Sequence, residues 1–437
     1  MKSENEFVRT EIGIIPNDWE TVCLGDNCAK IGSGFTPRGA EKVYKESGVV
    51  LIRSQNVYNN SFSKGGLVYL DESTAREMDN VTVEKDDVLL NITGDSVARC
   101  CTVPEEILPA RVNQHVSIIR TKKERLDPTF LRYYLTSPRM QAFMLSLAES
   151  GGTRNALTKG MIERFVVPKP RIEEQISIAR IPSALDSRIT LNQQMNRTLE
   201  AIAKAIFKHW FADLEFPNTE GKPYKSSGGE MIYDEDLERE IPKGWKVGKT
   251  NEIATQVKEQ VSPSEQAEEI YNHYSIEAYD SGMKPTLQQG SEILSNKFIV
   301  RDNTVLVSKL NPRIQRIWPV ISAARNSVCS TEFLVFEPRK NSFCYFYHLM
   351  LSEIWKDLIR MARGTSSSHQ RISSSDILDY PILIPPQEIL ESFEHITFSN
   401  VDAREQNVAQ QLTMQEIRDS LVPRLVSGKI GVPIEAG

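Results

Sequence analysis

The sequence predicts a mixed α/β (α+β) protein that contains two copies of one globular domain, separated by two long helices that form an antiparallel coiled coil. Three observations lead to this prediction. Five features recur in the same order at an offset of roughly 212 to 226 residues. Two long segments carry apolar residues at alternating steps of three and four. The chain of 437 residues is about three times as long as a typical domain of ~150 residues, so more than one hydrophobic core is expected.

The repeated features are an Ile-Pro-x-x-Trp motif, an extended apolar run after a polar turn, an aromatic helix, a Gly-Thr loop and an apolar strand that ends in proline. They lie at 15–19, 83–90, 130–137, 152–153 and 165–168 in the first copy, and at 241–245, 300–307, 345–352, 364–365 and 382–385 in the second. Repetition in a fixed order indicates an internal duplication. Because the identity between the copies is low, we expect them to share a fold more than a surface.

Each copy is followed by a segment with a heptad pattern. The predicted seam consists of Leu185, Ile189, Asn192, Asn196, Leu199, Ile206 and Trp210 in the first segment, and of Ile396, Asn400, Asn407, Met414, Ile417 and Leu421 in the second. Asparagine at a seam position lowers stability but fixes the register of the partner helix. Matching central asparagines therefore favour pairing of the two segments with each other. Two amphipathic helices that pack separately on their own domains are the alternative.

Proline sets the expected ends of the two helices. We expect the first main helix to run from near Ser183, after Pro182, to Trp210, a length of ~42 Å. The second is expected from about Gln387 to Val422, before Pro423, a length of ~54 Å. The predicted boundaries are 1–170 for the first domain, 171–212 for the first helix, 213–240 for a loop-rich linker, 241–386 for the second domain, and 387–437 for the second helix and tail.

Charge and hydropathy limit the classes of protein that the sequence can represent. The net charge is −6, and the acidic surplus lies in 171–240 and 386–437, whereas the two domains are neutral or slightly basic. With 40% apolar and 25% charged residues, the composition is that of a folded protein. No window approaches the ~18 consecutive apolar residues of a membrane span, and the first residues lack a signal-peptide pattern. We therefore expect a soluble, cytoplasmic protein that has no membrane partner.

Motifs for catalysis and for cofactor or metal binding are missing from the sequence. There is no phosphate-binding loop of the G-x-x-x-x-G-K-[ST] type, and Gly32-Ser-Gly34 lacks the third glycine of a dinucleotide loop. Asn311-Pro-Arg-Ile314 lacks the second proline and the aromatic residue of a base-flipping methyltransferase loop. The six cysteines include no Cys-x-x-Cys pair, and the six histidines include no His-x-x-x-His pair. We expect no active site, no cofactor and no metal in this chain.

Polar and basic loops remain as candidates for contact with DNA. Arg, Gln and Asn side chains have the geometry to read guanine or adenine in the major groove, and a basic run suits phosphates. The candidates in the first copy are Arg38, Arg53, Ser54, Gln55, Asn56, Asn113, Gln114, Thr153 and Arg154. Those in the second copy are Lys297, Arg301, Lys309, Arg313, Arg316, Arg363, Thr365, Gln370 and Arg371. The structural alternatives are turn-building for the polar clusters and a solvated strand and loop face for the basic run.

Several longer motifs carry a family resemblance. They are Gly34-Phe-Thr-Pro37, Asn113-Gln-His115, Pro168–Ile176, Asn192–Ile202, Ala205–Asp213 and the Arg418–Ile430 tail with its Pro-x-Leu-x-Ser-Gly-x-Ile pattern. In combination, and over nearly the whole chain, these motifs resemble the DNA specificity subunit of a type I restriction-modification system. Gly-x-Thr-Pro alone is weak, whereas the helix motif and the tail are specific together.

The resemblance implies a non-catalytic targeting subunit. Two target-recognition domains each read one half of an asymmetric bipartite site on double-stranded DNA, and the helix pair fixes the distance between the halves. Two modification (methyltransferase) subunits that use adenosylmethionine dock on the helices, and restriction motor-nuclease subunits that use ATP and Mg²⁺ join them. The second copy has Ser330-Thr-Glu-Phe333 where the first has Asn-Gln-His, so a base-reading role of Asn113 and Gln114 does not transfer to it. The alternative function is a coiled-coil adaptor that assembles protein partners without reading DNA.

Overall fold

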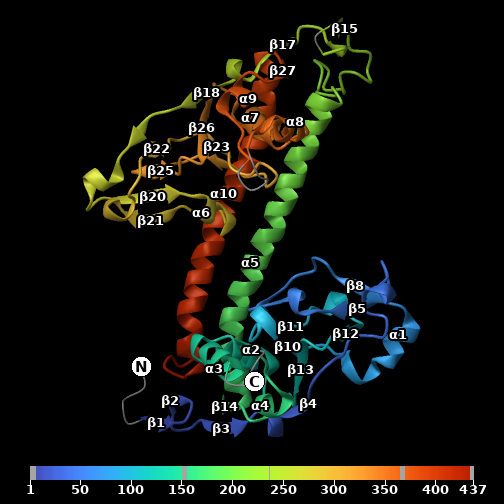
Figure 1. Ribbon diagram of the computed structural model, residues 1–437, viewed down its shortest axis with the longest axis vertical. Coiled ribbons are helices and arrows are strands. Elements are labelled where there is room, and N and C mark those ends of the chain that lie inside the picture. The colour runs from blue at the N-terminus through green and yellow to red at the C-terminus, as the bar shows by residue number, and fades with distance from the viewer. Residues whose placement is uncertain (1–5, 150–154, 236, 365–369, 434–437) are drawn as a thin grey trace. The chain divides into compact units, whose positions relative to one another are not determined.

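The computed structural model describes residues 6–149, 155–235, 237–364 and 370–433 (Figure 1). The chain divides into two compact units. The first consists of Met1–Ile189 with Thr413–Gly437, and the second consists of Thr190–Leu412. Both long helices continue from one unit into the other, so each unit contains part of either helix. Among the described residues, no helix has the length and apolar character that a bilayer span requires.

Two four-stranded sheets form the centre of the first unit. Their strand orders are β11-β10-β13-β4 and β8-β5-β12-β9. The strands are β4 (Cys28–Ser33), β5 (Val49–Ile52), β8 (Val68–Leu70), β9 (Thr82–Val83), β10 (Val88–Asn91), β11 (Cys100–Thr102), β12 (Ala110–Val112) and β13 (Val116–Thr121). All neighbours are antiparallel except β5 and β12, which run parallel with Val50 opposite Ala110.

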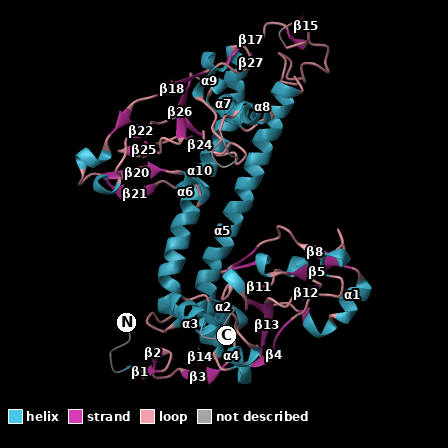
Figure 2. Ribbon diagram, in the orientation of Figure 1, coloured by secondary structure: helices cyan, strands magenta, loops and turns pink. Residues whose placement is uncertain are grey.

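The second unit repeats this arrangement strand for strand. Its sheets have the orders β24-β23-β26-β18 and β21-β20-β25-β22-β19, with β19 added at one edge (Figure 2). The strands are β18 (Ala254–Val257), β19 (Gln260–Val261), β20 (Ile270–Tyr274), β21 (Thr286–Gln289), β22 (Lys297–Ile299), β23 (Thr304–Ser308), β24 (Ile317–Val320), β25 (Ser327–Cys329) and β26 (Phe333–Pro338). Here β20 and β25 form the parallel pair, with Asn272 opposite Ser327. The shared strand order confirms the predicted duplication.

Smaller elements are duplicated as well. The first unit has the hairpins β1 (Phe7–Thr10) with β2 (Gly13–Pro16) and β6 (Val57–Tyr58) with β7 (Ser61–Phe62), the pair β3 (Glu20–Cys23) with β14 (Val166–Lys169), and the helices α1 (Glu72–Glu77), α2 (Pro128–Leu135), α3 (Pro138–Glu149) and α4 (Lys159–Glu163). The second has the hairpin β15 (Met231–Asp234) with β16 (Arg239–Pro242), the pair β17 (Lys246–Lys249) with β27 (Pro381–Ile384), and the helices α6 (Ile276–Asp280), α7 (Phe343–Met350), α8 (Ile354–Met361) and α9 (Ser374–Leu378). The two expected aromatic helices are α2 and α7.

The long helices are longer than the prolines led us to expect. Helix α5 spans Ile172–Phe207 and ends in a π turn at Lys208–Ala212, and α10 spans Gln387–Val426. Pro182 and Pro423 therefore lie inside helices, and the expected start near Ser183 and end at Val422 were wrong. A proline removes one helical hydrogen bond, but burial of neighbouring apolar side chains outweighs that loss. Ile178 and Ala179 before Pro182, and Leu425 and Val426 after Pro423, are buried in the core of the first unit.

Paired polar side chains show that α5 and α10 run antiparallel with one register. In the first unit, Arg418 Nη1 lies 2.7 Å from Asp186 Oδ1. In the second unit, the pairs are Asn192 with Gln410 at 3.3 Å, Asn196 with Asn407 at 2.9 Å and Glu200 with Arg404 at 3.6 Å. The two residue numbers of every pair add up to about the same value, as an antiparallel register requires. We call these four pairs the polar ladder.

Parts of the predicted seam lie outside the interface between the helices. The side chains of Ile396 and Ile417 are each 44% exposed, so neither is a buried seam residue. In their place, α10 buries Phe393, Thr397 and Val401 in the second unit. Phe393 and Val401 belong to the core of the globular domain there. The helix thus turns much of its apolar surface toward a sheet domain. It contacts α5 through the polar ladder and also through Phe393, whose ring lies 6.0 Å from that of Phe207 and 5.8 Å from that of Trp210. A heptad count cannot distinguish these two kinds of apolar face.

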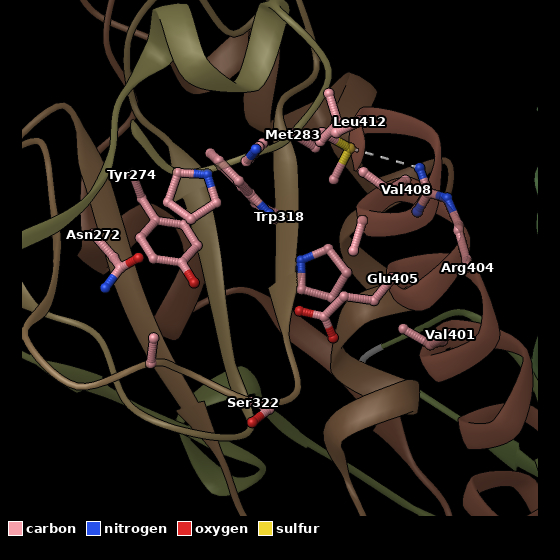
Figure 3. A pocket seen from close by; sticks show the side chains of 15 residues that line it. Asn272, Tyr274, Met283, Trp318, Ser322, Val401, Arg404, Glu405, Val408 and Leu412 are labelled. Atoms are coloured by element: carbon pink, nitrogen blue, oxygen red, sulfur yellow. Dashed lines mark hydrogen bonds between the residues drawn. The ribbon is translucent and has the colours of Figure 1, made fainter. Parts of the chain in front are cut away.

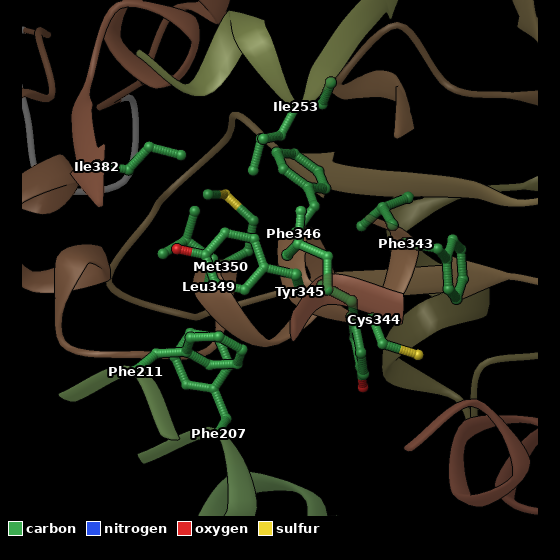
Figure 4. Packing of buried hydrophobic residues seen from close by; sticks show 14 of the residues in the cluster. Phe207, Phe211, Ile253, Phe343, Cys344, Tyr345, Phe346, Leu349, Met350 and Ile382 are labelled. Atoms are coloured by element: carbon green, nitrogen blue, oxygen red, sulfur yellow. The ribbon is translucent and has the colours of Figure 1, made fainter. Parts of the chain in front are cut away.

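The core of each unit is completed by the end of a helix from the other copy. In the first unit, Val422, Leu425 and Val426 of α10 pack in one cluster with Ile15 and Trp19. In the second, the end of α5 plays this part, because Phe207 and Phe211 pack against Tyr345 of α7 (Figure 4). The end of α10 thus packs with Trp19 of the first Ile-Pro-x-x-Trp motif, and the end of α5 packs with Trp245 of the second.

Candidate nucleic-acid interface

The parallel strands β5 and β12 bring two predicted loops to one edge of the first unit. Because parallel strands end at the same side of a sheet, the segments that follow Ile52 and Val112 emerge together. The Asn113 N–H donates to the Ile52 carbonyl at 3.1 Å, and the Gly34 N–H donates to the Asn113 carbonyl at 3.1 Å. The motifs that begin at Gly34, Arg53 and Asn113 thus meet at one surface, which we call the reading edge.

Gly34 is required by the close approach of two backbones. A Cβ atom at this position would lie 1.6 Å from the carbonyl oxygen of Val112, which is backbone and cannot turn away. Only glycine lets the loop after β4 lie against the loop after β12. At Gly32, two residues earlier, a Cβ atom would meet no heavy atom within 4 Å, so its surroundings are open. The backbone approach therefore explains why the first residue of the Gly-x-Thr-Pro motif is glycine.

A chain of side-chain hydrogen bonds runs along the reading edge. The hydroxyl of Thr36 donates to Oε1 of Gln114, and Nε2 of Gln114 lies 3.0 Å from Nε2 of His115. Nδ1 of His115 then lies 2.5 Å from the hydroxyl of Thr93. Gln114 is exposed, so its amide is held in place by protein while it still faces solvent. A fixed amide at the surface is suited to hydrogen bonding with a base edge.

The predicted cluster from Arg53 to Asn56 divides into structural and exposed residues. Asn56 is fully buried, accepts from the Arg53 N–H at 3.0 Å and donates to the carbonyls of Ser63 and Gly65. As a direct contact for DNA, Asn56 was wrong, since its amide is used to build a turn. Gln55 is exposed and Ser54 is half-buried.

Arg53 and Asn113 lie at the reading edge, but their side chains also make hydrogen bonds within the protein. The Arg53 guanidinium donates to the Gly66 carbonyl at 2.6 Å and lies 5.7 Å from the centre of the Tyr44 ring. Asn113 is 9% exposed, and its Oδ1 accepts from the His115 N–H at 3.0 Å. Asn113 thus shapes the loop that presents Gln114.

Other candidates of the first unit were missed by sequence reasoning or lie outside the described residues. The Arg99 guanidinium lies 4.9 Å from the centre of the Tyr58 ring, and the ring is 42% exposed. No local pattern joins residues 41 positions apart, so nothing in the sequence signalled this pair. Thr93 was also missed, and His115 was recognised as part of the Asn113-Gln-His115 motif but not as a candidate contact. Arg38 is exposed, whereas Thr153 and Arg154 lie outside the described residues.

The second unit builds the same edge with other side chains. The Ser330 N–H donates to the Tyr274 carbonyl at 2.9 Å, as that of Asn113 does to Ile52. The Ser330 hydroxyl accepts from the Glu332 N–H at 3.3 Å, which repeats the bond from His115 to Asn113. Ser330 therefore replaces Asn113 in the turn, and Glu332 stands where the first unit has His115.

An ion pair occupies this second reading edge. Nε and Nη2 of Arg371 lie 3.2 and 3.1 Å from the two carboxylate oxygens of Glu332, and this hydrogen bonding raises the pKa of Arg371 above its ordinary value. Arg371 and Leu310 form a backbone bridge, and so do Arg371 and Arg363. The Arg363 side chain is 87% exposed and lies 3.9 Å from Asp376. Arg371 and Arg363 are thus gathered near Glu332 and Asp376, beside the end of β25.

The predicted basic run from Lys297 to Arg316 is not one surface. Arg316 is 7% exposed and makes two 2.7 Å hydrogen bonds to the carboxylate of Asp280, which lower the pKa of Asp280 and raise that of Arg316. Lys297 is also 7% exposed and donates to Ser295 Oγ at 2.6 Å, and burial lowers its pKa. Arg301 pairs with Glu259. Because Arg316 and Lys297 are buried and hydrogen-bonded to protein groups, neither can belong to a surface that faces phosphates.

The rest of the basic run lies near the second reading edge. The Lys309 N–H donates to the Glu332 carbonyl at 2.9 Å, and the Asn311 N–H donates to the Gln370 carbonyl at 2.8 Å. These bonds place the loop that carries the exposed Arg313 beside Gln370 and Arg371. Thr365 lies outside the described residues.

The described residues offer no arrangement for metal chemistry. No group of three or more His, Cys, Asp or Glu side chains in that part of the chain is positioned to hold a metal ion. The buried thiols are those of Cys28, Cys100, Cys101, Cys329 and Cys344, and burial raises the pKa of each. Thiols that are buried and protonated are poor nucleophiles.

Comparisons with known proteins agree on one family. The family model described as "Type I restriction modification DNA specificity domain" matches residues 16–201 and again residues 242–410. The chain is 26% identical to the type I restriction enzyme MjaIX specificity subunit of Methanocaldococcus jannaschii, over 98% of this chain and 97% of that protein. It is 23% identical to the HindI specificity subunit of Haemophilus influenzae, over 95% and 100%. Its fold is similar to the crystal structure of the S subunit from M. genitalium, with a TM-score of 0.61, 14% identity and coverage of 93% and 96%.

Proposed function

Because the chain belongs to the family of type I restriction-modification DNA specificity proteins, and the family model matches it twice, we propose that its two reading edges each recognise one half of a bipartite DNA site. The observation that carries this proposal is the pair of edges built on one backbone plan. Both edges follow a parallel strand pair, and the Asn113 N–H bond to Ile52 has its counterpart in the Ser330 N–H bond to Tyr274. The side chains that project from them differ, as two different half-sites require.

In the first unit, we assign base reading to Gln114, with Arg38, Arg53 and Gln55 as neighbouring contacts. The amide of Gln114 is held between Thr36 and His115, so it approaches DNA with little loss of conformational freedom. A bidentate glutamine contact is suited to adenine.

In the second unit, we assign reading to Arg371 and Glu332. An arginine fork suits guanine, and a carboxylate accepts from the amino group of cytosine. On binding, their mutual ion pair would be exchanged for contacts with bases. Arg313 and Arg363 are exposed and suit phosphates.

We further propose that the polar ladder sets the spacing between the half-sites. An apolar seam tolerates a shift of register, whereas a shifted ladder leaves amides and charges without partners. Asp186 also accepts from the Tyr133 hydroxyl of α2 at 2.6 Å, so the ladder is connected to the domain as well as to the partner helix.

The partners of the proposed complex are two modification subunits, motor-nuclease subunits and double-stranded DNA. Adenosylmethionine, ATP and Mg²⁺ would be bound by those subunits, and this chain would direct them without catalysis. An exposed apolar stripe on α5 supports a docking role for the helices. Leu191, Met195 and Ile202 lie on one face and are 43%, 42% and 45% exposed.

The experiment that tests the proposed function is mapping of methylated sites by single-molecule sequencing. DNA is taken from cells that express the chain with its modification subunit and from cells that express the modification subunit alone. We expect a bipartite motif with a fixed spacer only when the chain is present. If an active modification subunit gives no such motif, the adaptor function replaces DNA reading.

Two biochemical controls sharpen this test. DNA binding through about six phosphates should lose ~10³ in affinity between 50 and 200 mM salt, and a salt-independent interaction would contradict DNA contact. Leu191→Asp with Met195→Asp should prevent purification with the modification subunit but leave stability unchanged. Gln193→Asp, on an exposed neighbouring position of α5, is the matched control.

A further inference from the structure

A cavity that the DNA-reading function does not use lies in the second unit between α10 and the sheet domain. Its volume is about 230 Å³ (Figure 3). One wall carries Tyr274, Trp318 and Pro319, and the opposite wall carries residues of α10, including Val408 and Leu412. This volume suits a ligand of about ten non-hydrogen atoms, because pockets for larger ligands have volumes of ~300–1,000 Å³.

A carboxylate without a cationic partner faces this apolar cavity. Glu405 accepts from the Ile321 N–H at 3.3 Å, and no ion pair joins it to any of the described residues. A carboxylate that is half-buried among apolar groups with one long hydrogen bond is poorly solvated. A positively charged group would compensate it.

The aromatic residues of the cavity suit the same kind of ligand. The rings of Tyr274 and Trp318 lie 4.7 Å apart at an interplanar angle of 58°, and both side chains are almost fully buried. The faces of aromatic rings attract cations, most strongly for tryptophan. Aromatic rings beside an uncompensated carboxylate therefore favour an organic cation over a neutral or anionic ligand.

The basic side chains of the lining are engaged by other groups. Arg404 donates to the Tyr347 hydroxyl at 2.6 Å, lies 3.6 Å from Glu200, and has Met283 Sδ at 3.8 Å. In Figure 3 its guanidinium points toward Met283, away from the carboxylate of Glu405. Lys284 also has an interaction. Among the described residues, no ion pair joins Arg404 or Lys284 to Glu405.

We propose that this cavity binds a small protonated organic amine, with its ammonium group on Glu405 and its apolar body between the aromatic wall and α10. None of the residues to which we assign DNA reading lines this cavity, so amine binding does not depend on the proposed function. Occupancy would connect the second recognition domain to α10, the helix that carries half of the polar ladder.

The ionisation of Glu405 gives this proposal a pH dependence. Burial, followed by the nearby Asp402, raises the pKa of Glu405 to about 7, and Tyr274, Arg404 and Lys284 are the other ionisable groups of the lining. An amine with a pKa near 10 stays charged from pH 6 to 8, whereas Glu405 becomes ionised over this range. Binding should therefore strengthen as the pH rises from 6 to 8.

The test uses 4-fluorophenethylamine as the probe and the full-length chain as the target. Its ¹⁹F resonance is followed in a titration, with 4-fluorophenethyl alcohol as the neutral analogue. We expect saturable binding of the amine that is at least tenfold tighter than that of the alcohol. Glu405→Gln should weaken amine binding at least tenfold, and Glu388→Gln, an exposed carboxylate on the same helix, should not change it.

A second variant tests the place of binding. Val408→Phe should fill the cavity and abolish binding of both probes, while circular dichroism and thermal unfolding verify that the fold is retained. Should Val408→Phe fail to fold, Glu405→Gln with the two probes still decides the question. Equal amine binding by the wild type and Glu405→Gln, or no saturable binding by the wild type, would overturn the proposal.

Discussion

The two reading edges have the same backbone and different chemistry. In the first unit, the edge is a hydrogen-bonded chain of Thr36, Gln114, His115 and Thr93. In the second, an ion pair of Glu332 and Arg371 stands at the corresponding place. Asn113 and Ser330 make equivalent turn hydrogen bonds although they are different residues. At each edge, the residue that shapes the loop is therefore separate from the residues that project from it.

The comparison predicts that Gly34→Val disables the first edge and leaves the second intact. The Cβ would clash with the Val112 carbonyl, so we expect a loss of more than about 3 kcal/mol in the stability of the first unit. Mapping of methylated sites should show loss of the original motif. Gly32→Ala is the matched control and should retain it. At the position that corresponds to Gly34 by strand register, the second unit has Glu259, so Glu259→Val should be tolerated there.

Within the second unit, Arg316 and Arg313 should behave differently. Arg316 is buried, whereas the Asp280 side chain is 47% exposed and stays solvated when its partner is removed. We therefore expect Arg316→Ala to lower the free energy of unfolding by about 2 kcal/mol, through the lost hydrogen bonds and the lost packing of the buried side chain. Arg313→Ala should leave stability unchanged and should weaken binding to all DNA sequences, with a flatter salt slope. Urea unfolding and binding titrations at several salt concentrations measure these effects. If Arg316→Ala unfolds normally and weakens DNA binding, the basic run is one surface after all.

Stability should depend on pH in the second unit more than in the first, because of His348. Burial lowers its pKa to about 4, and its imidazole is hydrogen-bonded to the Cys344 carbonyl at 2.7 Å. In the unfolded chain the pKa is about 6.5, so the unfolded state binds more protons between pH 6.5 and 4, and stability falls as the pH drops. We expect a loss of about 2 kcal/mol between pH 7 and 5.

The corresponding position of the first unit has no imidazole that could titrate between pH 7 and 5. Tyr133 of α2 occupies the place that His348 has in α7, and its hydroxyl donates to Asp186. Urea unfolding at both pH values should show a smaller pH dependence for His348→Gln than for the wild type. An unchanged dependence would mean that other groups carry it.

Substitutions at the reading edges should affect one half-site each. Arg371→Ala should weaken binding by about 1 to 3 kcal/mol and relax specificity in one half-site only, and Gln114→Ala should do the same for the other half. Competition binding with DNA libraries that vary each half in turn measures both. A change in the same half-site for both variants would contradict the assignment of one half to each unit.

The smallest expected effect concerns the polar ladder. Asn196→Leu leaves the amide of Asn407, 8% exposed, without its partner and should destabilise by about 1 kcal/mol. Replacing both residues by Leu should restore stability but weaken the preference for one spacer length. Unfolding and spacer-library binding test the pair. If the double variant keeps its preference for one spacer length, the pair of Asn196 and Asn407 is not needed for that preference.

Much of the fold could be predicted from the sequence because it is repeated and periodic. The duplicated strand order, the aromatic helices and the antiparallel helix pair follow from local patterns that occur twice. The meeting of the loops at Gly34 and Asn113 was not predicted. The two motifs were assigned only to the same family pattern, and the close backbone approach that joins them is visible only in the structure.

The candidate site could be predicted only in part. A count of basic residues along the chain does not show which of them point inward, and Arg316 finds its partner Asp280 36 positions away. Asn56 has a side chain suited to a base, but the same side chain closes a turn. Pro182 and Pro423 suggested helix ends, but both helices continue through these prolines, because apolar side chains beside them such as Ile178 and Leu425 are buried.

The closing of the first unit by the end of α10 has a consequence for biosynthesis. Gly428 lies against Pro16 and Trp19, so the beginning of the chain completes its packing only after the last helix is made. At ~5–20 residues per second, the ribosome needs roughly ten to fifty seconds to make the part between the two segments of this unit. During that time the first sheets exist without the helix that covers them. The nascent chain thus has an interval in which chaperones and proteases compete for it, and the first recognition domain matures at about the same time as the second.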